Sequence, residues 1–390
     1  MASDASMHIA QGSTLPPAQP TYILRGHSAQ IHSVCFLQDN LRLLSGDADG
    51  WVVLWDIPNK RPMAVWHAHN GTVLGLKAWG DERVITHGRD NKLCVWQLDE
   101  TRVGDFSTML PIEDAVTERK KPWLLHSLPV HALNFCSFAM GPASTSHTPD
   151  SDESEILVLY PGVQDGSIIV TSLPSEERFA TIPPPRSDSK SGMLMALALH
   201  QEPSTNPSLL VIAGYEGGNT CLWSQNTTTK IWEVVRRYKL HSQPILSLDL
   251  ASKLAFLYTS SADAAIAQYP LYTQADPKVA QTKHAGQQSL TVRDDEKILA
   301  TAGWDGRVRV YSCKTMKELA VLKWHKEGCY ALAFARSRDS GKSYVSVLEE
   351  PGLVTKKEFT VSERRQQIAK ETHWLAAGSK DGKISLWNIY

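Results

Sequence analysis

The run Ser45-Gly46-Asp47-Ala48-Asp49-Gly50-Trp51-Val52-Val53-Leu54-Trp55-Asp56 is typical of a tight turn followed by a β-strand. Asp49-Gly50 is a dipeptide that accepts positive φ in a hairpin, and the β-branched and aromatic residues after it favour an extended strand. A histidine, His27, lies 22 residues before Asp49, and Trp55 lies six residues after it. The run therefore predicts a hairpin that ends in Trp-Asp and has a histidine upstream.

The same six-residue step from a turn acid to a strand aromatic recurs along the chain, each time with a histidine upstream. The further copies are His69 with Asp90 and Trp96, His241 with Asp263 and Tyr269, His284 with Asp305 and Tyr311, and His325 with Asp381 and Trp387. Two more copies are degenerate: one has Thr171 in place of the aromatic, and the other reaches Trp223 without the acid. Seven such units predict an all-β chain that forms a seven-bladed β-propeller.

The two ends of the sequence predict how the ring closes. The last unit stops at Tyr390, after its third strand, so its blade lacks an outer strand. Tyr22-Ile23-Leu24-Arg25 is a strand without a blade of its own. Pairing the two removes an exposed edge that would otherwise template aggregation. We therefore expect residues 21–390 to form one propeller, closed by the N-terminal strand pairing into the last blade.

These motifs resemble the WD40 repeat, in which a His, a Ser or Thr, an Asp and a Trp form a buried hydrogen-bond network that fixes each hairpin. The resemblance assigns this structural role to His27, Ser45, Asp49 and Trp55; to His69, Thr86, Asp90 and Trp96; to His241, Thr259 and Asp263; to His284, Thr301 and Asp305; and to His325, Asp381 and Trp387. Ala377 occupies the Ser/Thr position of unit seven, and units five and six carry Tyr in place of Trp, which predicts an incomplete network in these three units. A Ser-His-Asp hydrolase is disfavoured, because a catalytic triad needs one copy in one cleft and this set is repeated. We expect no catalytic residue, cofactor or metal site.

Composition narrows the function further. The chain has 40 basic and 41 acidic residues, a balance that argues against direct nucleic-acid or anionic-membrane binding. Six cysteines without CxxC spacing indicate buried free thiols of a reducing compartment. The sequence contains neither a long apolar run nor a signal-peptide pattern, so we expect no membrane partner.

The tail and insertions depart from the repeat length. We expect residues 1–20 to be a disordered tail and residues 99–122, 139–155 and 337–372 to be insertions, with a short helix capped at Ser362 in the last. Connections from first to second and from third to fourth strand emerge on one face of a propeller. All these insertions, and the loop 201–208, belong to those two kinds. We therefore expect a partner site on that face.

Some side chains are not required by the repeat and are candidates for partner contacts. An exposed Trp or Arg makes a plausible interface anchor, although most such residues only pack or are solvated. The candidates are Trp304, the basic cluster Arg119, Lys120 and Lys121, and the pair Arg364 and Arg365. Trp79, Trp123, Trp324 and Trp374 have no assigned role, and Ser151, amid acidic residues, is a candidate phosphorylation site.

Beyond the generic repeat, several segments resemble fungal ASTRA-associated protein 1 and its animal relative, the guanine nucleotide-binding protein β-subunit-like protein 1. They are 22–34, the turn 46–52, Trp66-His67-Ala68-His69 and the closing 376–387. The resemblance implies a nuclear, non-enzymatic subunit of the ASTRA complex, linked to chromatin remodelling. It also implies as partners the HEAT-repeat co-chaperone and the phosphatidylinositol-3-kinase-like kinases that this co-chaperone matures.

Three other functions are weighed against this one. A substrate receptor of a cullin-type ubiquitin ligase is less favoured, because Trp55-Asp56-Ile57-Pro58 lacks the Arg common in such adaptors and no F-box-like region is recognised. A G-protein β-like signalling scaffold is disfavoured, because the residues before the first strand are few and Pro-rich for a coiled-coil helix. An enzyme lacks any recognisable site.

Overall fold

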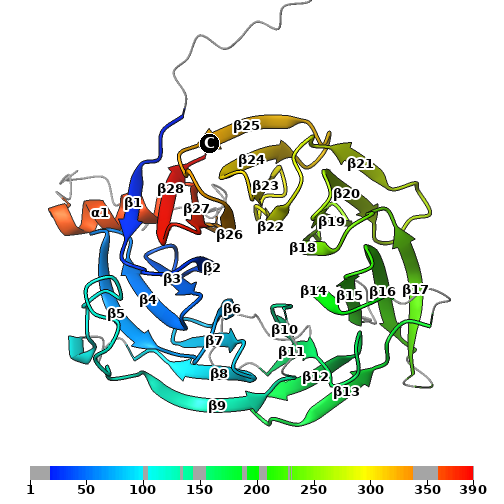
Figure 1. The fold of residues 1–390 in the computed structure, drawn as a ribbon, viewed down its shortest axis with the longest axis horizontal. Coiled ribbons are helices and arrows are strands. Elements are labelled where there is room, and N and C mark those ends of the chain that lie inside the picture. The colour runs from blue at the N-terminus through cyan, green and yellow to red at the C-terminus, as the bar shows by residue number, and fades with distance from the viewer. Residues whose placement is uncertain are drawn as a thin grey trace, which may run out of the picture.

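The computed structural model describes residues 18–99, 104–131, 135–143, 155–186, 191–201, 209–226, 229, 231–336 and 359–389. Within these residues the chain forms one α-helix and seven four-stranded antiparallel sheets, which stand around a central channel as the blades of a disc (Figure 1). This confirms the predicted seven-bladed β-propeller.

Each blade contributes four strands from the channel to the rim (Figure 1). The innermost strands are β2 (Ile31–Leu37), β6 (Val73–Trp79), β10 (Ala139–Pro142), β14 (Leu194–Gln201), β18 (Ile245–Ala251), β22 (Gln287–Val292) and β26 (Cys329–Phe334). The second strands are β3 (Arg42–Asp47), β7 (Arg83–Gly88), β11 (Ile156–Pro161), β15 (Leu209–Tyr215), β19 (Phe256–Ser261), β23 (Ile298–Gly303) and β27 (Trp374–Ser379).

The third strands are β4 (Trp51–Asp56), β8 (Lys92–Gln97), β12 (Ile168–Leu173), β16 (Asn219–Gln225), β20 (Ala265–Pro270), β24 (Arg307–Ser312) and β28 (Lys383–Asn388). The outer strands are β5 (Arg61–His67), β9 (Trp123–Pro129), β13 (Arg178–Ile182), β17 (Trp232–Lys239), β21 (Lys278–Gln281), β25 (Glu318–Lys323) and β1 (Tyr22–Arg25).

The ring closes as the sequence predicts. β1 pairs antiparallel with β28, so that Tyr22 faces Leu386 and Arg25 faces Lys383. The first segment of the fold thus supplies the outer strand of the last blade. Leu24, Ile31 and Ile384 belong to one buried cluster that joins blade seven to blade one. The closure is therefore both hydrogen-bonded and packed.

The turn between β3 and β4 explains why the repeat needs glycine. Gly50 has a φ of 91°, and a Cβ atom added there would lie 1.8 Å from the carbonyl oxygen of His69. The hairpin tip of one blade therefore lies directly against the connection that leads into the next blade. The turn glycines of three other blades approach the carbonyl oxygen of a histidine in the same way: Gly218 that of His241, Gly306 that of His325 and Gly382 that of His27.

The connections of first to second and third to fourth strands define one face of the disc, which we call the insertion face. The opposite face carries the upstream histidines, and we call it the histidine face. The insertion 337–372 contains α1 (Val361–Glu371), and its N-cap is Thr360, two residues before the expected Ser362. Asn40 in the β2–β3 turn donates to the carbonyl of Lys370, which places α1 on the insertion face.

Two other expected insertions differ from the prediction. Ala139–Pro142 is the strand β10, so the segment 139–155 begins as part of a blade and its insertion is shorter. Residues 104–122, which we call the strap, do not stay on the insertion face. The carbonyl of Ser107 accepts from the amide of Val65 on β5, and the amide of Ile112 donates to Gly26, both at 2.9 Å. Gly26 lies before β2 on the histidine face, so the strap crosses the rim of blade one.

Other expectations fall outside the described residues. They concern the tail 1–17, the acidic loop 144–154 with Ser151, and the loop 202–208.

Candidate interaction surfaces

The polar network of blade one is centred on a different acid from the expected one. Nδ1 of His27 lies 2.6 Å from Oδ2 of Asp47, and Nε2 lies 2.7 Å from Oγ of Ser45, which also accepts from Nε1 of Trp55 at 2.8 Å. The other carboxylate oxygen of Asp47 accepts from the amide of Trp51 at 2.9 Å. Asp49 is exposed, so its assignment to the network was wrong.

The distances in this network match those of a Ser-His-Asp triad, but its surroundings exclude that chemistry. The side chains of His27 and Asp47 are fully buried, and Ser45 is buried with them. The serine oxygen already accepts the indole N–H of Trp55, and a substrate carbonyl has no route to it. A nucleophile must reach a reacting atom about 3 Å away. The network can therefore hold the hairpin but cannot attack a substrate.

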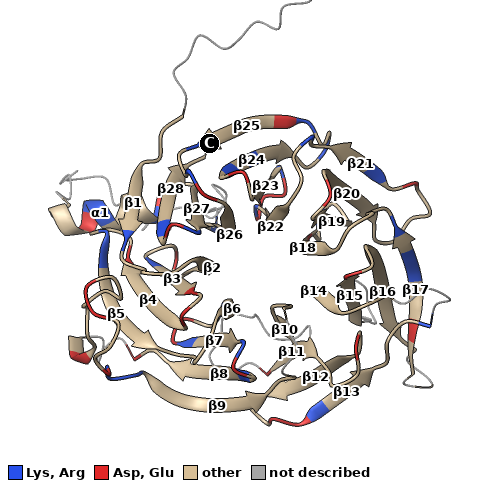
Figure 2. Cartoon of the chain, in the orientation of Figure 1, with Lys and Arg blue, Asp and Glu red and all other residues tan. Residues whose placement is uncertain are grey.

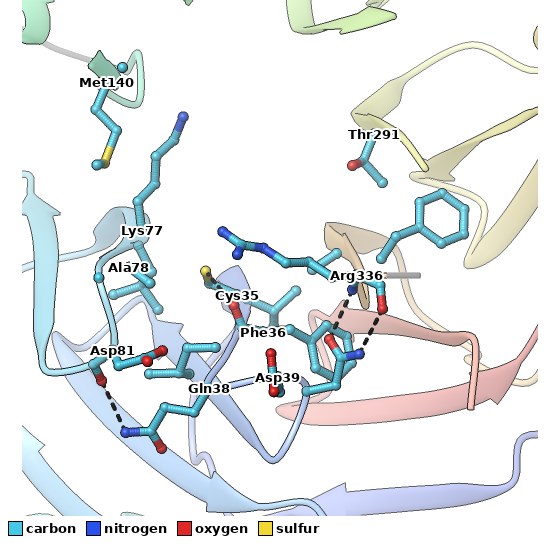
Figure 3. A pocket seen from close by; sticks show the side chains of 18 of the residues that line it. Cys35, Phe36, Gln38, Asp39, Lys77, Ala78, Asp81, Met140, Thr291 and Arg336 are labelled. Carbon is cyan, nitrogen blue, oxygen red and sulfur yellow. Dashed lines mark hydrogen bonds between the residues drawn. The ribbon is translucent and has the colours of Figure 1, made fainter. Parts of the chain in front are cut away.

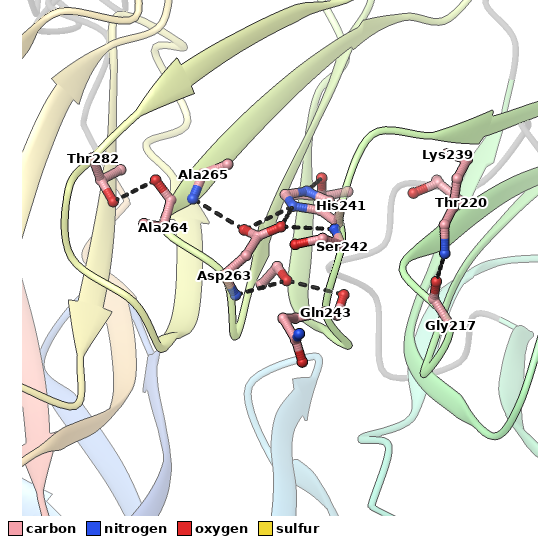
Figure 4. A network of polar contacts seen from close by, with 12 residues as sticks. Gly217, Thr220, Lys239, His241, Ser242, Gln243, Asp263, Ala264, Ala265 and Thr282 are labelled. Carbon is pink, nitrogen blue, oxygen red and sulfur yellow. Dashed lines mark hydrogen bonds and ion pairs between the residues drawn. The ribbon is translucent and has the colours of Figure 1, made fainter.

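Blades two and five bring together the residues expected of them. Nδ1 of His69 lies 2.9 Å from Asp90 and Nε2 lies 2.7 Å from Thr86, which also accepts from Trp96. In blade five, Asp263 lies between the ring of His241 and the amides of Ser242 and Ala265, as Figure 4 shows. Burial lowers the pKa of His241, although the Asp263 carboxylate opposes the shift.

Blade six departs from the pattern, and the assignment of His284 to a buried network was wrong. The His284 side chain is 48% exposed, and its Nδ1 lies 3.8 Å from Asp305. In blades one, two, five and seven, the first paired residue of the inner strand comes four positions after the histidine. In blade six that residue is Gln287, which faces Gly303 and comes only three positions after His284. His284 therefore lies one position too late in the chain to enter the network. Thr301 donates instead to the buried Gln287 side chain at 2.8 Å, and Asp305 pairs with Arg309 at 2.6 Å.

Blade seven takes the hydroxyl of its network from another strand. Nε2 of His325 lies 2.9 Å from Oγ of Ser385, which also accepts from Nε1 of Trp387 at 2.8 Å. Ser385 is the cross-strand partner of Ala377, the residue at the usual hydroxyl position. A hydroxyl on β28 therefore takes the place of the one missing on β27, but the network is incomplete at its acid, because the buried Nδ1 of His325 has no hydrogen-bond partner among the described residues. Nδ1 of His325 lies 3.5 Å from Asp381.

The candidate contact residues of the basic cluster separate into buried and exposed positions. Arg119 is only 7% exposed, so its assignment as a partner contact was wrong. Its guanidinium stacks on the ring of Trp51 at 4.5 Å and donates to the carbonyls of Met109 and Asp114, which fixes the strap against blade one. Lys120 and Lys121 are exposed, and Lys120 pairs with Asp105 at 3.0 Å.

The remaining candidates lie at the surface. Trp304 is 46% exposed, and its Nε1 donates to Gln288 at 2.8 Å. Arg364 and Arg365 are exposed on α1, and Arg365 donates to Asn59 of the β4–β5 turn at 3.2 Å.

The four unassigned tryptophans separate by exposure. Trp79 and Trp374 are buried, and Trp324 is half-buried. Trp123 in β9 is 71% exposed, and sequence reasoning left it without a role. Its position next to Leu124 and Leu125, in a strand without Lys, Arg, Asp or Glu, is the signal that could have singled it out.

A depression of about 630 Å³ opens where the central channel reaches the insertion face (Figure 3). The turns β2–β3 and β6–β7 and the end of β26 form its walls. Lys77 and Arg336 reach into it, while Asp39 and Asp81 lie in the exposed turns at its edge (Figure 3). The backbone of Arg336 is clamped, because Asn40 accepts from its amide at 2.9 Å and donates to its carbonyl at 2.8 Å.

The side chains of this depression suit binding and not nucleophilic chemistry. Burial lowers the pKa of Lys77, with the carboxylate of Asp249 opposing the shift. Burial also raises the pKa of the Cys35 thiol, so this cysteine is not a ready thiolate.

The cysteine thiols, possible metal ligands and the helix α1 add no further candidate site within the described residues. All six cysteines are free, and burial raises the pKa of Cys329 to about 12. Across the described ranges, no three His, Cys, Asp or Glu side chains gather as a metal site, and α1 is not long and apolar enough to cross a membrane.

The sequence of this chain is similar, over nearly its whole length, to a protein family and to several known proteins. A family model described as ASTRA-associated protein 1 matches residues 20–387. The chain is 45% identical over 388 residues to ASTRA-associated protein 1 of Verticillium alfalfae, covering 97% of this chain and 94% of that protein. It is 32% identical over 408 residues to the protein of that name in Schizosaccharomyces pombe, covering 95% and 99%. It is 29% identical over 387 residues to guanine nucleotide-binding protein subunit beta-like protein 1 of Mus musculus, covering 96% and 97%.

Proposed function

Because this chain belongs to the ASTRA-associated protein 1 family, we propose that it works as a non-enzymatic scaffold subunit of the ASTRA complex. The observation that carries the proposal is the match of the family model over residues 20–387, a range that covers every strand of the seven blades apart from the last residue of β28. A closed propeller holds its loops on a rigid scaffold, an arrangement suited to protein–protein contacts. The burial of the Ser45 and His27 side chains supports a structural role for the His–Ser–Asp sets.

The proposal extends to partners and location. The family resemblance supports contacts with the HEAT-repeat co-chaperone, a role in the maturation of phosphatidylinositol-3-kinase-like kinases, and a link to chromatin remodelling in the nucleus. If this is correct, depleting the chain in fungal cells lowers the steady-state amount of these kinases, and a fluorescent fusion accumulates in the nucleus.

Affinity purification with mass spectrometry tests the proposal directly. The tagged full-length chain, expressed from its own locus, should recover ASTRA subunits together with the HEAT-repeat co-chaperone and kinase-like proteins. Recovery of cullin adaptors would point to a ubiquitin-ligase receptor, and recovery of a γ subunit to a G-protein β-like scaffold. Either result, or purification of the chain alone, would overturn the proposal.

We also infer that at least one partner contacts the insertion face. The depression around Lys77 and Arg336 and the docked helix α1 support this position. Reversing the exposed charges of Arg364 and Arg365 to Glu should reduce partner recovery without changing the melting temperature. The matched control is Lys326→Glu, an exposed lysine of the β25–β26 connection on the histidine face. Equal recovery from both variants would count against this face.

A further inference from the structure

The outer strand of blade two differs from the other six outer strands in charge. β9 has the sequence Trp-Leu-Leu-His-Ser-Leu-Pro and contains no Lys, Arg, Asp or Glu. Every other outer strand carries at least one: Arg25, Arg61, Arg178, Glu233, Lys278 and Glu318 are examples, one from each. Figure 2 shows β9 tan along its length, whereas β17 carries coloured segments. Charged residues on an outer strand discourage pairing with another chain, and β9 lacks this protection.

β9 also exposes three consecutive large apolar side chains. Trp123 is 71% exposed, Leu124 is 45% exposed and Leu125 is 37% exposed. Trp123 pairs with Gln97 and Leu124 with Trp96. Trp123 and Leu124 are adjacent in the regular pairing and therefore point to opposite faces of the sheet, so apolar surface is exposed on both faces of the blade at the rim. Leu125 lies where the register shifts, directly after the partner of Trp96. A partner that paired with this strand would cover both faces at once.

The backbone edge of β9 is open, whereas the neighbouring edge is covered. In the described part of the chain, β9 pairs only with β8. On blade one, the strap lies along β5, and the carbonyl of Ser107 accepts from the amide of Val65 at 2.9 Å. The molecule thus covers one outer edge with an extended segment of its own and leaves the uncharged edge beside it free.

Charges at the two ends of β9 indicate the chemistry of its occupant. Lys121 is exposed just before the strand, next to Lys120, which pairs with Asp105 at 3.0 Å, and the exposed Lys92 of β8 faces Pro129 at the other end. In an antiparallel pair of two β9 strands, Lys121 of one copy would lie at the end of the pair where the other copy places Lys92 on the next strand inward, so a second copy would bring like charges to each end. A segment with acidic residues on both flanks is complementary to these lysines, and a second copy of the chain is not.

We propose that β9 is a docking edge for an extended apolar segment of a partner protein, which adds a strand to blade two and carries acidic residues on both flanks. Main-chain hydrogen bonds would supply affinity, and the apolar and acidic side chains would supply specificity. This inference rests on the proposed function only in requiring a protein partner. It concerns the rim of the disc, whereas the depression described above opens on the insertion face.

Hydrogen exchange tests the edge in the native assembly. The tagged chain is purified with its partners, and amide exchange of residues 123–129 is compared between the complex and the chain freed of partners by high salt. We expect slower exchange of β9 in the complex and unchanged exchange of β25. Equal exchange of β9 in the two samples would overturn the proposal. So would protection that appears in the isolated chain as its concentration rises, together with a dimer mass.

Charge insertion provides a second, independent readout. Leu125→Lys places a charge on the edge, and the matched control is Leu319→Lys, which changes a 50% exposed leucine on the already charged strand β25. Leu125→Lys should reduce recovery of the protecting partner about tenfold or more, with wild-type recovery from Leu319→Lys and equal melting temperatures. Undiminished recovery from Leu125→Lys overturns the inference. If the chain purifies alone, the proposed function fails as well; if partners are present and β9 is unprotected, only this inference fails.

Discussion

Replacing Asp47 by alanine should destabilise the propeller strongly, whereas replacing Asp49 should not. The Asp47 carboxylate is fully buried and accepts from Nδ1 of His27 at 2.6 Å and from the amides of Asp49 and Trp51 at 3.0 and 2.9 Å. Asp49 is exposed, and it is its carbonyl oxygen that lies 2.9 Å from Nε2 of His67. Alanine at position 49 keeps that carbonyl.

The size of the effect follows from the groups left without a partner. Asp47→Ala strands Nδ1 of His27 and the amide of Trp51 in a site closed to water. Each buried polar group without a partner costs about 1–3 kcal/mol, so the free energy of unfolding should fall by about 3–5 kcal/mol. Asp47→Asn keeps an acceptor and should lose less. Asp49→Ala should stay within about 0.5 kcal/mol of the wild type.

Unfolding followed by tryptophan fluorescence measures these differences, since the chain contains 12 tryptophans. The matched control lies in blade two, where Asp90, at the position corresponding to Asp49, accepts from His69. Asp90→Ala should therefore destabilise the protein although Asp49→Ala does not. If Asp49→Ala lowers the unfolding midpoint as much as Asp47→Ala, the assignment of the acid in blade one is wrong.

Three further substitutions, at Ser385, Arg119 and His87, have outcomes that follow from the contacts or the burial of the replaced side chain. Ser385→Ala should cost about 1–3 kcal/mol in unfolding measurements, because it leaves Nε2 of His325 without its hydroxyl partner. Arg119→Ala should make the strap sensitive to limited proteolysis, whereas Lys120→Ala, which breaks an exposed ion pair, should not. Burial lowers the pKa of His87 from 6.5 to about 3, so the unfolded chain binds the extra proton and stability should fall as the pH drops from 6.5 toward 3. His87→Leu should flatten that slope in a series of denaturation midpoints against pH.

The fold could be predicted from the sequence because its signal is local and repeated. The acid–aromatic step and the turn glycine lie within one hairpin, so each blade can be recognised from its own residues alone. The closure of the ring could also be predicted, because the segment of β1 belonged to no repeat unit and the last unit lacked a fourth strand. What the sequence predicted well therefore depends on residues close together in the chain.

The acid of blade one could not be chosen by spacing, because Asp47 and Asp49 lie in the same turn. The difference between blades one and two lies in the space beside the histidine. Gly88 occupies in blade two the position of Asp47, and a Cβ there would lie 2.4 Å from the ring of His69. Blade two therefore has no room for an acid at that position and uses Asp90 instead.

The other departures from expectation depend on contacts between distant residues. Ser385 can supply the hydroxyl that Ala377 lacks only because the two residues face each other across β27 and β28, and this pairing is known only from the strand register. Arg119 lies in a polar segment of the kind usually exposed to solvent, and it is buried because Trp51, far earlier in the chain, offers its ring. Neither contact leaves a periodic signal in the sequence.

The strap and α1 stabilise the closure of the ring, whereas the proposed docking edge β9 lies on a different blade. Closure depends on a four-residue strand, β1, and both elaborations lie beside that junction: the strap bonds Gly26 on the histidine face, and α1 contacts Asn40 on the insertion face. Both therefore stabilise blade one next to its junction with blade seven, which is where the ring would open. β9, on the next blade, takes no part in the β1–β28 pairing and is the outer strand without Lys, Arg, Asp or Glu. Loosening the strap should consequently lower stability while leaving the open edge of blade two able to pair.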